Sequence, residues 1–159
     1  MRLNVGCGGG AYPFVPLIEG KDVVHADIDF RGMARGLNLV KCDAQQMPFK
    51  AGSMTEVVAS HLIEHLERPE FLLEESHRIL GDDGILRLKT PNFLSDNARR
   101  DETHRQFYNY FTLNRLLKEH GFRASFKLNI MSQFRLLEVM LSALIIPFLH
   151  ELDATATKS

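Results

Sequence analysis

The stretch that decides the fold of this 159-residue chain is Leu3-Asn4-Val5-Gly6-Cys7-Gly8-Gly9-Gly10. A short apolar strand runs directly into four glycines within five residues, whereas strand interiors disfavour glycine. Glycines just past a strand let the backbone adopt positive φ, and a ligand can lie against the main chain because no Cβ intervenes. The pattern predicts a nucleotide-binding loop, and a tight turn without a ligand is the alternative for an isolated glycine cluster.

A second landmark favours the nucleotide-binding interpretation. Residues 21–29 resemble a strand that ends in carboxylates, and Asp27 follows the glycines by roughly 20 residues, the distance at which a dinucleotide-binding fold places an acid on the ribose hydroxyls. Between these landmarks, Pro13 and Pro16 could not both lie inside one regular helix. We therefore expect a short or broken helix from about Pro13, which suits a cofactor without a pyrophosphate.

Strands and crossings continue to alternate along the chain. The apolar run at residues 57–59 is typical of a parallel strand that is covered on both faces. Strand, crossing and strand in this order predict right-handed connections, with the ligand bound at the carboxyl ends of the strands. The remaining strands are expected at residues 39–42, 54–60, 85–90, 122–130 and 151–157.

Three further segments are interpreted as helices. Pro69 suits the first turn of a helix that Gly81 should end, before a turn at Asp83-Gly84. Thr112 is the expected N-cap of the next helix. Residues 133–149 are strongly apolar but too short and too polar to span a membrane. We expect them to form a sheet-covering helix, and a membrane-surface or dimer face is the alternative.

Composition and charge limit the partners. The chain is 45% hydrophobic and 25% charged with a net charge of −1, which fits one domain over residues 1–159 and lacks the basic excess of a nucleic-acid-binding protein. Residues 91–159 hold 9 Lys and Arg against 7 Asp and Glu and could face an anionic substrate. No secretory signal opens the chain, so the expected location is the cytoplasm. Cys7 and Cys42 end strands about 9–10 Å apart and should both be reduced.

Five segments together resemble the class I S-adenosylmethionine-dependent methyltransferases, especially the small-molecule, methyltransferase type 11-like group. The resemblance covers roughly residues 2–130. It rests on the glycine loop Gly6–Gly10, on Asp27, on Asp43-Ala44 before Met47-Pro48-Phe49, and on the segments Ser60–Leu66 and Glu75–Gly84. It implies a Rossmann-like doubly wound α/β sheet, mostly parallel with an antiparallel last strand, in three α/β/α layers. It also implies S-adenosylmethionine as the cofactor.

The resemblance assigns cofactor contacts residue by residue. Asp27 would accept hydrogen bonds from the ribose hydroxyls, which are stronger to a charged acceptor. Ile28 would pack on the adenine, and Asp43 would take the adenine amino group, with a turn or cap role as its alternative. The implied cofactor contacts are Gly6, Cys7, Gly8, Gly9, Asp27, Ile28, Asp43, Ala44 and Ser60.

His61 and His104 are the candidate catalytic residues. The resemblance places Ser60 and His61 beside the sulfonium and the entering acceptor. His104 lies in the connection that covers the active site of similar methyltransferases, and imidazole titrates near neutrality, so it is an acceptor contact or general base. A surface histidine that caps a loop is the alternative. His61 and His65 are four residues apart, as metal ligands can be, but no third ligand is in view and no metal is expected.

The implied reaction is methyl transfer to a small-molecule acceptor by in-line displacement, which depends mainly on alignment of acceptor, methyl and sulfur. Arg99, Arg100 and Arg105 could bind a carboxylate or phosphate of an anionic acceptor. The chain is expected to lack the lid helices that the family has before its first strand. The cofactor would then be unusually exposed, or a partner subunit of a homo-oligomer could supply a cover. Two alternatives stay open: a catalytically silent assembly module, and an NAD-dependent oxidoreductase, which shares Asp27 and the looser glycine fingerprint.

Overall fold

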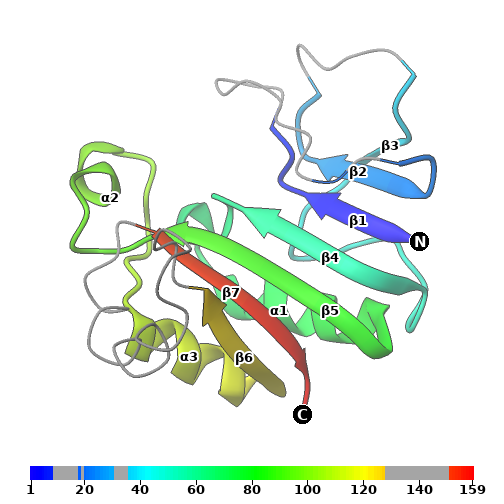
Figure 1. Cartoon of the computed structure of the whole chain (residues 1–159). Coiled ribbons are helices and arrows are strands. Elements are labelled where there is room, and N and C mark those ends of the chain that lie inside the picture. Colours follow the sequence, from blue (N-terminus) through cyan, green and yellow to red (C-terminus); the bar gives the residue numbers. More distant parts are fainter. Residues whose placement is uncertain (9–17, 19, 31–35, 128–150) are drawn as a thin grey trace, which may run out of the picture.

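The computed structural model describes residues 1–8, 18, 20–30, 36–127 and 151–159. They form a seven-stranded sheet in the order β3-β2-β1-β4-β5-β7-β6 (Figure 1). The strands are β1 (Arg2–Val5), β2 (Val23–Asp27), β3 (Leu39–Lys41), β4 (Met54–Ser60), β5 (Leu80–Pro91), β6 (Phe122–Lys127) and β7 (Glu151–Lys158). The helices are the 3₁₀ helix η1 (Ile63–His65), α1 (Pro69–Ile79), α2 (Asp96–Arg100) and α3 (Tyr110–Glu119).

The sheet grows in both directions from β1. This strand pairs in parallel with β2 and with β4, β5 extends the parallel set, and β7 runs antiparallel between β5 and β6. The arrangement confirms the predicted Rossmann-like doubly wound α/β sheet, mostly parallel with an antiparallel last strand. The chain order reverses between β1 and β4, and ligands of such sheets bind at the carboxyl ends of the strands at this switch point.

Helices α1 and α3 lie on the same side of the sheet (Figure 1). Pro69 occupies the first turn of α1 as predicted, where its missing N–H has no intrahelical partner to lose. None of the helices in the described ranges is long and apolar enough to cross a membrane. The helix expected from Pro13 and the apolar residues 133–149 lie outside the described residues.

Two boundaries predicted around α1 are wrong. The helix ends at Ile79, and its C-cap is Leu80 in an extended conformation, so Gly81 does not end it. Strand β5 already begins at Leu80, and the turn expected at Asp83-Gly84 lies inside this strand, where its register against β4 shifts. A bulge of this kind accommodates extra residues, so residues with turn propensity can lie within a strand.

The predicted N-cap of α3 is also wrong. Asn109 occupies that position, and its Oδ1 accepts a hydrogen bond from the Thr112 N–H at 2.9 Å. Thr112 Oγ1 in turn accepts one from the Asn109 N–H at 2.9 Å. The reciprocal pair is a capping box, so Thr112 stabilises the helix start from its third residue and not from the cap itself.

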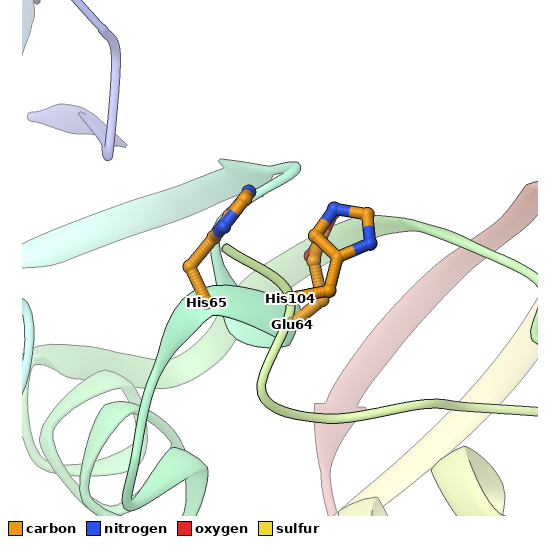
Figure 2. Close-up of side chains that lie close together, drawn as sticks. All are labelled: Glu64, His65 and His104. Atoms are coloured by element: carbon orange, nitrogen blue, oxygen red, sulfur yellow. The ribbon is translucent and has the colours of Figure 1, made fainter. Parts of the chain in front are cut away.

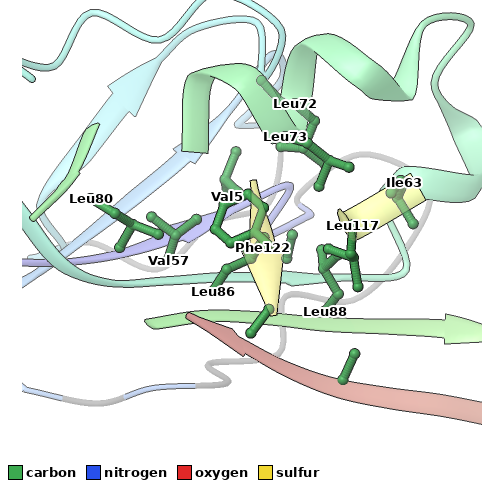
Figure 3. Packing of buried hydrophobic residues seen from close by; sticks show 14 of the residues in the cluster. Val5, Val57, Ile63, Leu72, Leu73, Leu80, Leu86, Leu88, Leu117 and Phe122 are labelled. Atoms are coloured by element: carbon green, nitrogen blue, oxygen red, sulfur yellow. The ribbon is translucent and has the colours of Figure 1, made fainter. Parts of the chain in front are cut away.

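The hydrophobic core lies between the sheet and these two helices (Figure 3). Leu72 and Leu73 of α1 and Leu117 of α3 belong to one buried cluster with Leu86 and Leu88 of β5, and none of the five is more than 1% exposed. Burial of one such side chain contributes about 1.5–3 kcal/mol. The core therefore fixes the central strands, whose carboxyl ends carry the candidate site.

A polar clamp joins α1 to the loop before β4. The Arg78 guanidinium donates to the Phe49 carbonyl at 2.7 Å and to the Met47 carbonyl at 2.9 Å. It also donates to both carboxylate oxygens of Glu75, at 2.6 and 2.8 Å, and Glu75 accepts the Met47 N–H at 2.7 Å. Arg78 and Glu75 thus fix the loop that follows Asp43, one of the expected cofactor contacts.

We predict that acid weakens this clamp through Glu75. The hydrogen bond from Arg78 is the largest cause that lowers the pKa of Glu75 from its ordinary value of 4.5. A carboxyl group with a lowered pKa in the folded state contributes stability above its unfolded pKa, and this is lost as pH falls through the folded pKa. From about pH 5 downward, urea unfolding should therefore show a smaller loss of stability in Glu75→Gln than in the wild type. An identical pH dependence would exclude this role of Glu75.

Candidate functional site

The predicted cofactor residues come together at one edge of the sheet. The last residue pairs of β1 join Val5 to Ala26 of β2 and to Ala59 of β4. Gly6, Asp27 and Ser60 directly follow these paired residues, so the three lie at neighbouring strand ends. The Cys42 N–H donates to the Asp27 carbonyl at 3.0 Å, which brings Asp43 to the same edge. Residues far apart in the sequence therefore form one continuous rim.

The glycine loop has the conformation that its composition predicts. Gly6 and Gly8 have φ values of 68° and 81°, which glycine adopts without steric cost. Cys7 lies between them, and burial raises the pKa of its thiol to about 12, so this cysteine is not a reactive thiolate. Cys7 and Cys42 are both free thiols, as predicted. Gly9 lies outside the described residues.

Asp27 is held in place by two backbone hydrogen bonds. Its Oδ2 accepts the Gly8 N–H at 2.9 Å, and its Oδ1 accepts the Asp29 N–H at 3.0 Å. An ionised carboxylate has about four lone-pair sites, so each oxygen can accept a further hydrogen bond. The carboxylate is therefore a fixed acceptor of the kind that two ribose hydroxyls require.

The expected adenine contacts flank Asp27. Ile28 is 65% exposed, which leaves its side chain available to pack on a flat apolar ring. Asp43 Oδ1 accepts the Gln45 N–H at 2.8 Å, so Asp43 does form the turn that was its alternative role, with Ala44 buried behind it. The turn role leaves other lone pairs of this carboxylate available. These residues fit a nucleoside that lies across the ends of β2 and β3.

The part of the rim at the end of β4 begins with a strained residue. His61 has a φ of 51°, a value that costs a non-glycine residue about 1–2 kcal/mol. Its Nδ1 lies 3.3 Å from Glu64 Oε1 and its Nε2 lies 3.2 Å from Glu151 Oε1. The Glu64 carboxylate is the largest cause of a raised pKa of His61. The imidazole is thus placed at the end of β4 between two carboxylates.

Glu64 connects this segment to the loop after α2. The Glu64 carbonyl accepts the N–H groups of Arg105 and Gln106 at 2.8 and 3.0 Å. Its carboxylate is 2% exposed, and Oε2 accepts a hydrogen bond from Thr90 Oγ1 at 3.0 Å. The other oxygen, Oε1, pairs with His61 Nδ1 at 3.3 Å, which meets the need of a buried carboxylate oxygen for a partner.

The loop after α2 also places His104 beside His65. Their ring centroids are 4.7 Å apart at an interplanar angle of 63°, and Figure 2 shows both rings beside Glu64. The His104 side chain is only 6% exposed, and its Nδ1 donates to the Ala98 carbonyl at 2.9 Å. His104 is thus an almost buried member of a polar cluster and not a surface histidine.

Two other sequence-based hypotheses concern this side. His61 and His65 are four residues apart, but only residues 63–65 are helical, and His61 lies close to Glu64 and Glu151. Arg105, a candidate anion-binding residue, forms an exposed ion pair with Glu67. The sequence analysis did not connect Glu64 with His104, because no local pattern links residues 40 positions apart.

Comparisons with known proteins identify the family of the chain. The family model of the methyltransferase domain, Methyltransf_11, matches residues 3–88. A "probable S-adenosylmethionine-dependent methyltransferase" of Mycobacterium tuberculosis is 26% identical over 130 residues, which are 76% of this chain and 47% of that protein. The malonyl-[acyl-carrier protein] O-methyltransferase of Laribacter hongkongensis is 38% identical over 60 residues, which are 38% of this chain and 20% of that protein. The chain spans less than half the length of these two relatives.

The fold also matches a solved structure. A SAM-dependent methyltransferase from Archaeoglobus fulgidus has a TM-score of 0.71 to this chain at 23% identity, and the match covers 99% of this chain and 85% of that one. The family model spans the glycine loop, Asp27, Asp43 and Ser60, and it favours a methyltransferase over the NAD-dependent oxidoreductase. The chain therefore belongs to the methyltransferase domain family, which implies S-adenosylmethionine as its cofactor.

Proposed function

We propose that this protein transfers the methyl group of S-adenosylmethionine to a small-molecule acceptor. The observation that carries the proposal is the continuous rim formed by the positive-φ glycine loop, the doubly bonded Asp27 carboxylate and the end of β4. When bound, the cofactor supplies an electrophilic methyl group on its sulfonium. The residues of this chain have to hold it and to align the acceptor, an orientation effect that can contribute about 7–11 kcal/mol.

In this proposal each part of the rim has one task. Gly6 and Gly8 expose main chain to the methionyl part, Asp27 accepts from the ribose hydroxyls, and Ile28 packs on the adenine. Asp43 and Ala44 border the adenine edge, while Cys7, Gly9 and Ser60 complete the contacts near the sulfur. The assignment is supported by the positions of all these residues except Gly9 at adjoining strand ends.

His61 and His104 border the acceptor in this proposal. His61 lies at the end of β4, directly after Ser60. His104 donates its Nδ1–H to a carbonyl, so its Nε2 is the atom that could accept a proton from an acceptor. The mildly basic second part of the chain favours an anionic small molecule, and the relative named for O-methylation of a malonyl group favours an oxygen acceptor.

A transfer experiment tests this function. The purified protein would be incubated with methyl-labelled S-adenosylmethionine and the small-molecule fraction of a cell extract, and then with its protein and nucleic-acid fractions. We expect label in the small-molecule fraction together with release of S-adenosylhomocysteine. Label confined to a macromolecular fraction would overturn the proposed acceptor class. Cofactor binding without transfer in any fraction would favour the silent assembly module.

We further predict that Gly6→Ala weakens cofactor binding. An added Cβ would lie 2.7 Å from Leu62 Cδ2, and the φ of 68° costs alanine about 1–2 kcal/mol. Gly52→Ala is a matched control, because Gly52 has a φ of 69° with nothing within 4 Å of the added Cβ. Urea unfolding should show the strain in both variants, whereas only Gly6→Ala should bind S-adenosylhomocysteine at least about tenfold more weakly. Equal binding by both variants would contradict the proposed contact of Gly6.

A further inference from the structure

We propose that Glu64, His65 and His104 form a binding site for a zinc-type divalent cation. Ligand atoms of the three side chains lie within 4.8 Å of one another. Glu64 and His65 come from the turn η1, and His104 comes from the loop beside it (Figure 2). The site therefore joins two adjacent residues of η1 to a residue 39 positions beyond His65, and it does not include His61, which the sequence analysis had considered together with His65.

The distances suit a metal ion. Three atoms within 4.8 Å of one another all lie within about 2.8 Å of a common point, and zinc bonds to imidazole nitrogen or carboxylate oxygen are about 2.0–2.2 Å long. Side-chain movements of less than about 1 Å would close this gap.

The hydrogen bonds of both histidines select the nitrogen that could bind the ion. His104 Nδ1 faces the Ala98 carbonyl, which can only accept, so Nδ1 carries the proton. His65 Nδ1 lies 3.0 Å from Thr103 Oγ1, whose own proton goes to Asp101 Oδ1 at 2.5 Å. Nδ1 of His65 must therefore also be the donor. When the two rings are neutral, Nε2 has the lone pair, the arrangement that carbonyl and hydroxyl partners give to metal-binding histidines. Nε2 of His104 also lies 3.7 Å from Asp101 Oδ2.

Glu64 contributes a buried carboxylate. Its side chain is 2% exposed, Oε2 accepts a hydrogen bond from Thr90 Oγ1, and Oε1 lies 3.3 Å from His61 Nδ1. A bound cation would add to the compensation that His61 gives to the charge of this buried carboxylate. Two imidazoles with one carboxylate form a ligand set of zinc enzymes, whereas magnesium and calcium prefer oxygen ligands alone.

Three protein ligands would leave a coordination position open, as in catalytic and not in structural zinc sites. The cluster follows directly on β4, whose end is the proposed acceptor side. An oxygen of the acceptor could therefore occupy the open position, where a cation would orient it and favour its deprotonated form. This last step rests on the proposed function, but binding of the cation itself does not.

Calorimetric titration without cofactor tests the site. The protein would be freed of metal with a chelator, dialysed, and titrated separately with Zn²⁺ and Mg²⁺. We expect one Zn²⁺ per chain with micromolar affinity and no comparable binding of Mg²⁺. His65→Ala and His104→Ala should each weaken Zn²⁺ binding at least about 100-fold, whereas His120→Ala, at the C-cap of α3, should leave it unchanged. No Zn²⁺ binding by the wild type, or equal affinity in all three variants, would overturn the proposal.

A measurement on the wild type avoids variants that fail to fold. Nitrogen NMR of the histidine rings should show Zn²⁺-dependent shifts of Nε2 in His65 and His104 and none in His120. Shifts in other histidines alone would contradict the assignment. S-adenosylhomocysteine binding is measured with and without chelator in parallel. If the cofactor still binds after the metal is removed, failure of the zinc site would not mean that the proposed function fails as well.

Discussion

Asp27→Ala should lower the affinity for S-adenosylhomocysteine at least about 100-fold. Each hydrogen bond to a charged acceptor contributes about 1.5–3 kcal/mol, two ribose hydroxyls are involved, and 1.4 kcal/mol corresponds to a factor of ten. The variant also loses the bond from Asp27 Oδ2 to the Gly8 N–H, which holds the glycine loop. Isothermal titration calorimetry with the product cofactor would measure the loss without knowledge of the acceptor.

Two further variants separate the causes of that loss. Asp27→Asn keeps one oxygen that can accept the Gly8 N–H but removes the charge, so we expect an intermediate loss of about tenfold. Asp22→Ala is the control at the opposite end of β2, where Asp22 pairs with Arg2 at 2.7 Å. Its cofactor affinity should equal that of the wild type. The ribose contact would be refuted if the cofactor affinity of Asp27→Ala lay within threefold of that of the wild type, which is a difference of less than about 1 kcal/mol.

Phe122→Ala should cause the largest loss of stability. Phe122 lies at the start of β6 among the buried hydrophobic residues and is 1% exposed (Figure 3). Its ring contacts the His77 ring edge-on with centroids 5.4 Å apart. Removal of a buried phenylalanine ring costs about 3–5 kcal/mol because a cavity remains. For a chain of this length the expected fall in the melting temperature is about 6–20 °C. Urea and thermal unfolding would measure both quantities.

Phe111→Ala provides the matched control. Phe111 is 63% exposed on α3, so its removal should change the free energy of unfolding by no more than about 0.5 kcal/mol. Similar losses in the two variants would show that the ring of Phe122 does not carry the packing described here. A loss in Phe122→Ala alone would identify the junction of α1 and β6 as part of the core that supports the site.

The sequence predicted the sheet well because its signals are local. A continuous apolar run marked β4, and the glycines after β1 marked a loop that needs positive φ, which Gly6 and Gly8 adopt. Boundaries were less well predicted where one residue type serves two purposes. Gly81 could end a helix or lie in a bulge, and Asn109 and Thr112 can each cap a helix. Tertiary pairing decided between these choices.

The sequence by itself determined where the residues proposed to contact the cofactor lie. Its residues directly follow strands that pair in parallel, so the spacing of strands along the chain fixes where Gly6, Asp27 and Ser60 meet. Only the tertiary structure decided the surroundings of His104. Backbone hydrogen bonds from residues 105 and 106 to the Glu64 carbonyl bring that loop onto η1. Main-chain hydrogen bonds of this kind do not require a particular side chain, so a sequence pattern cannot predict them.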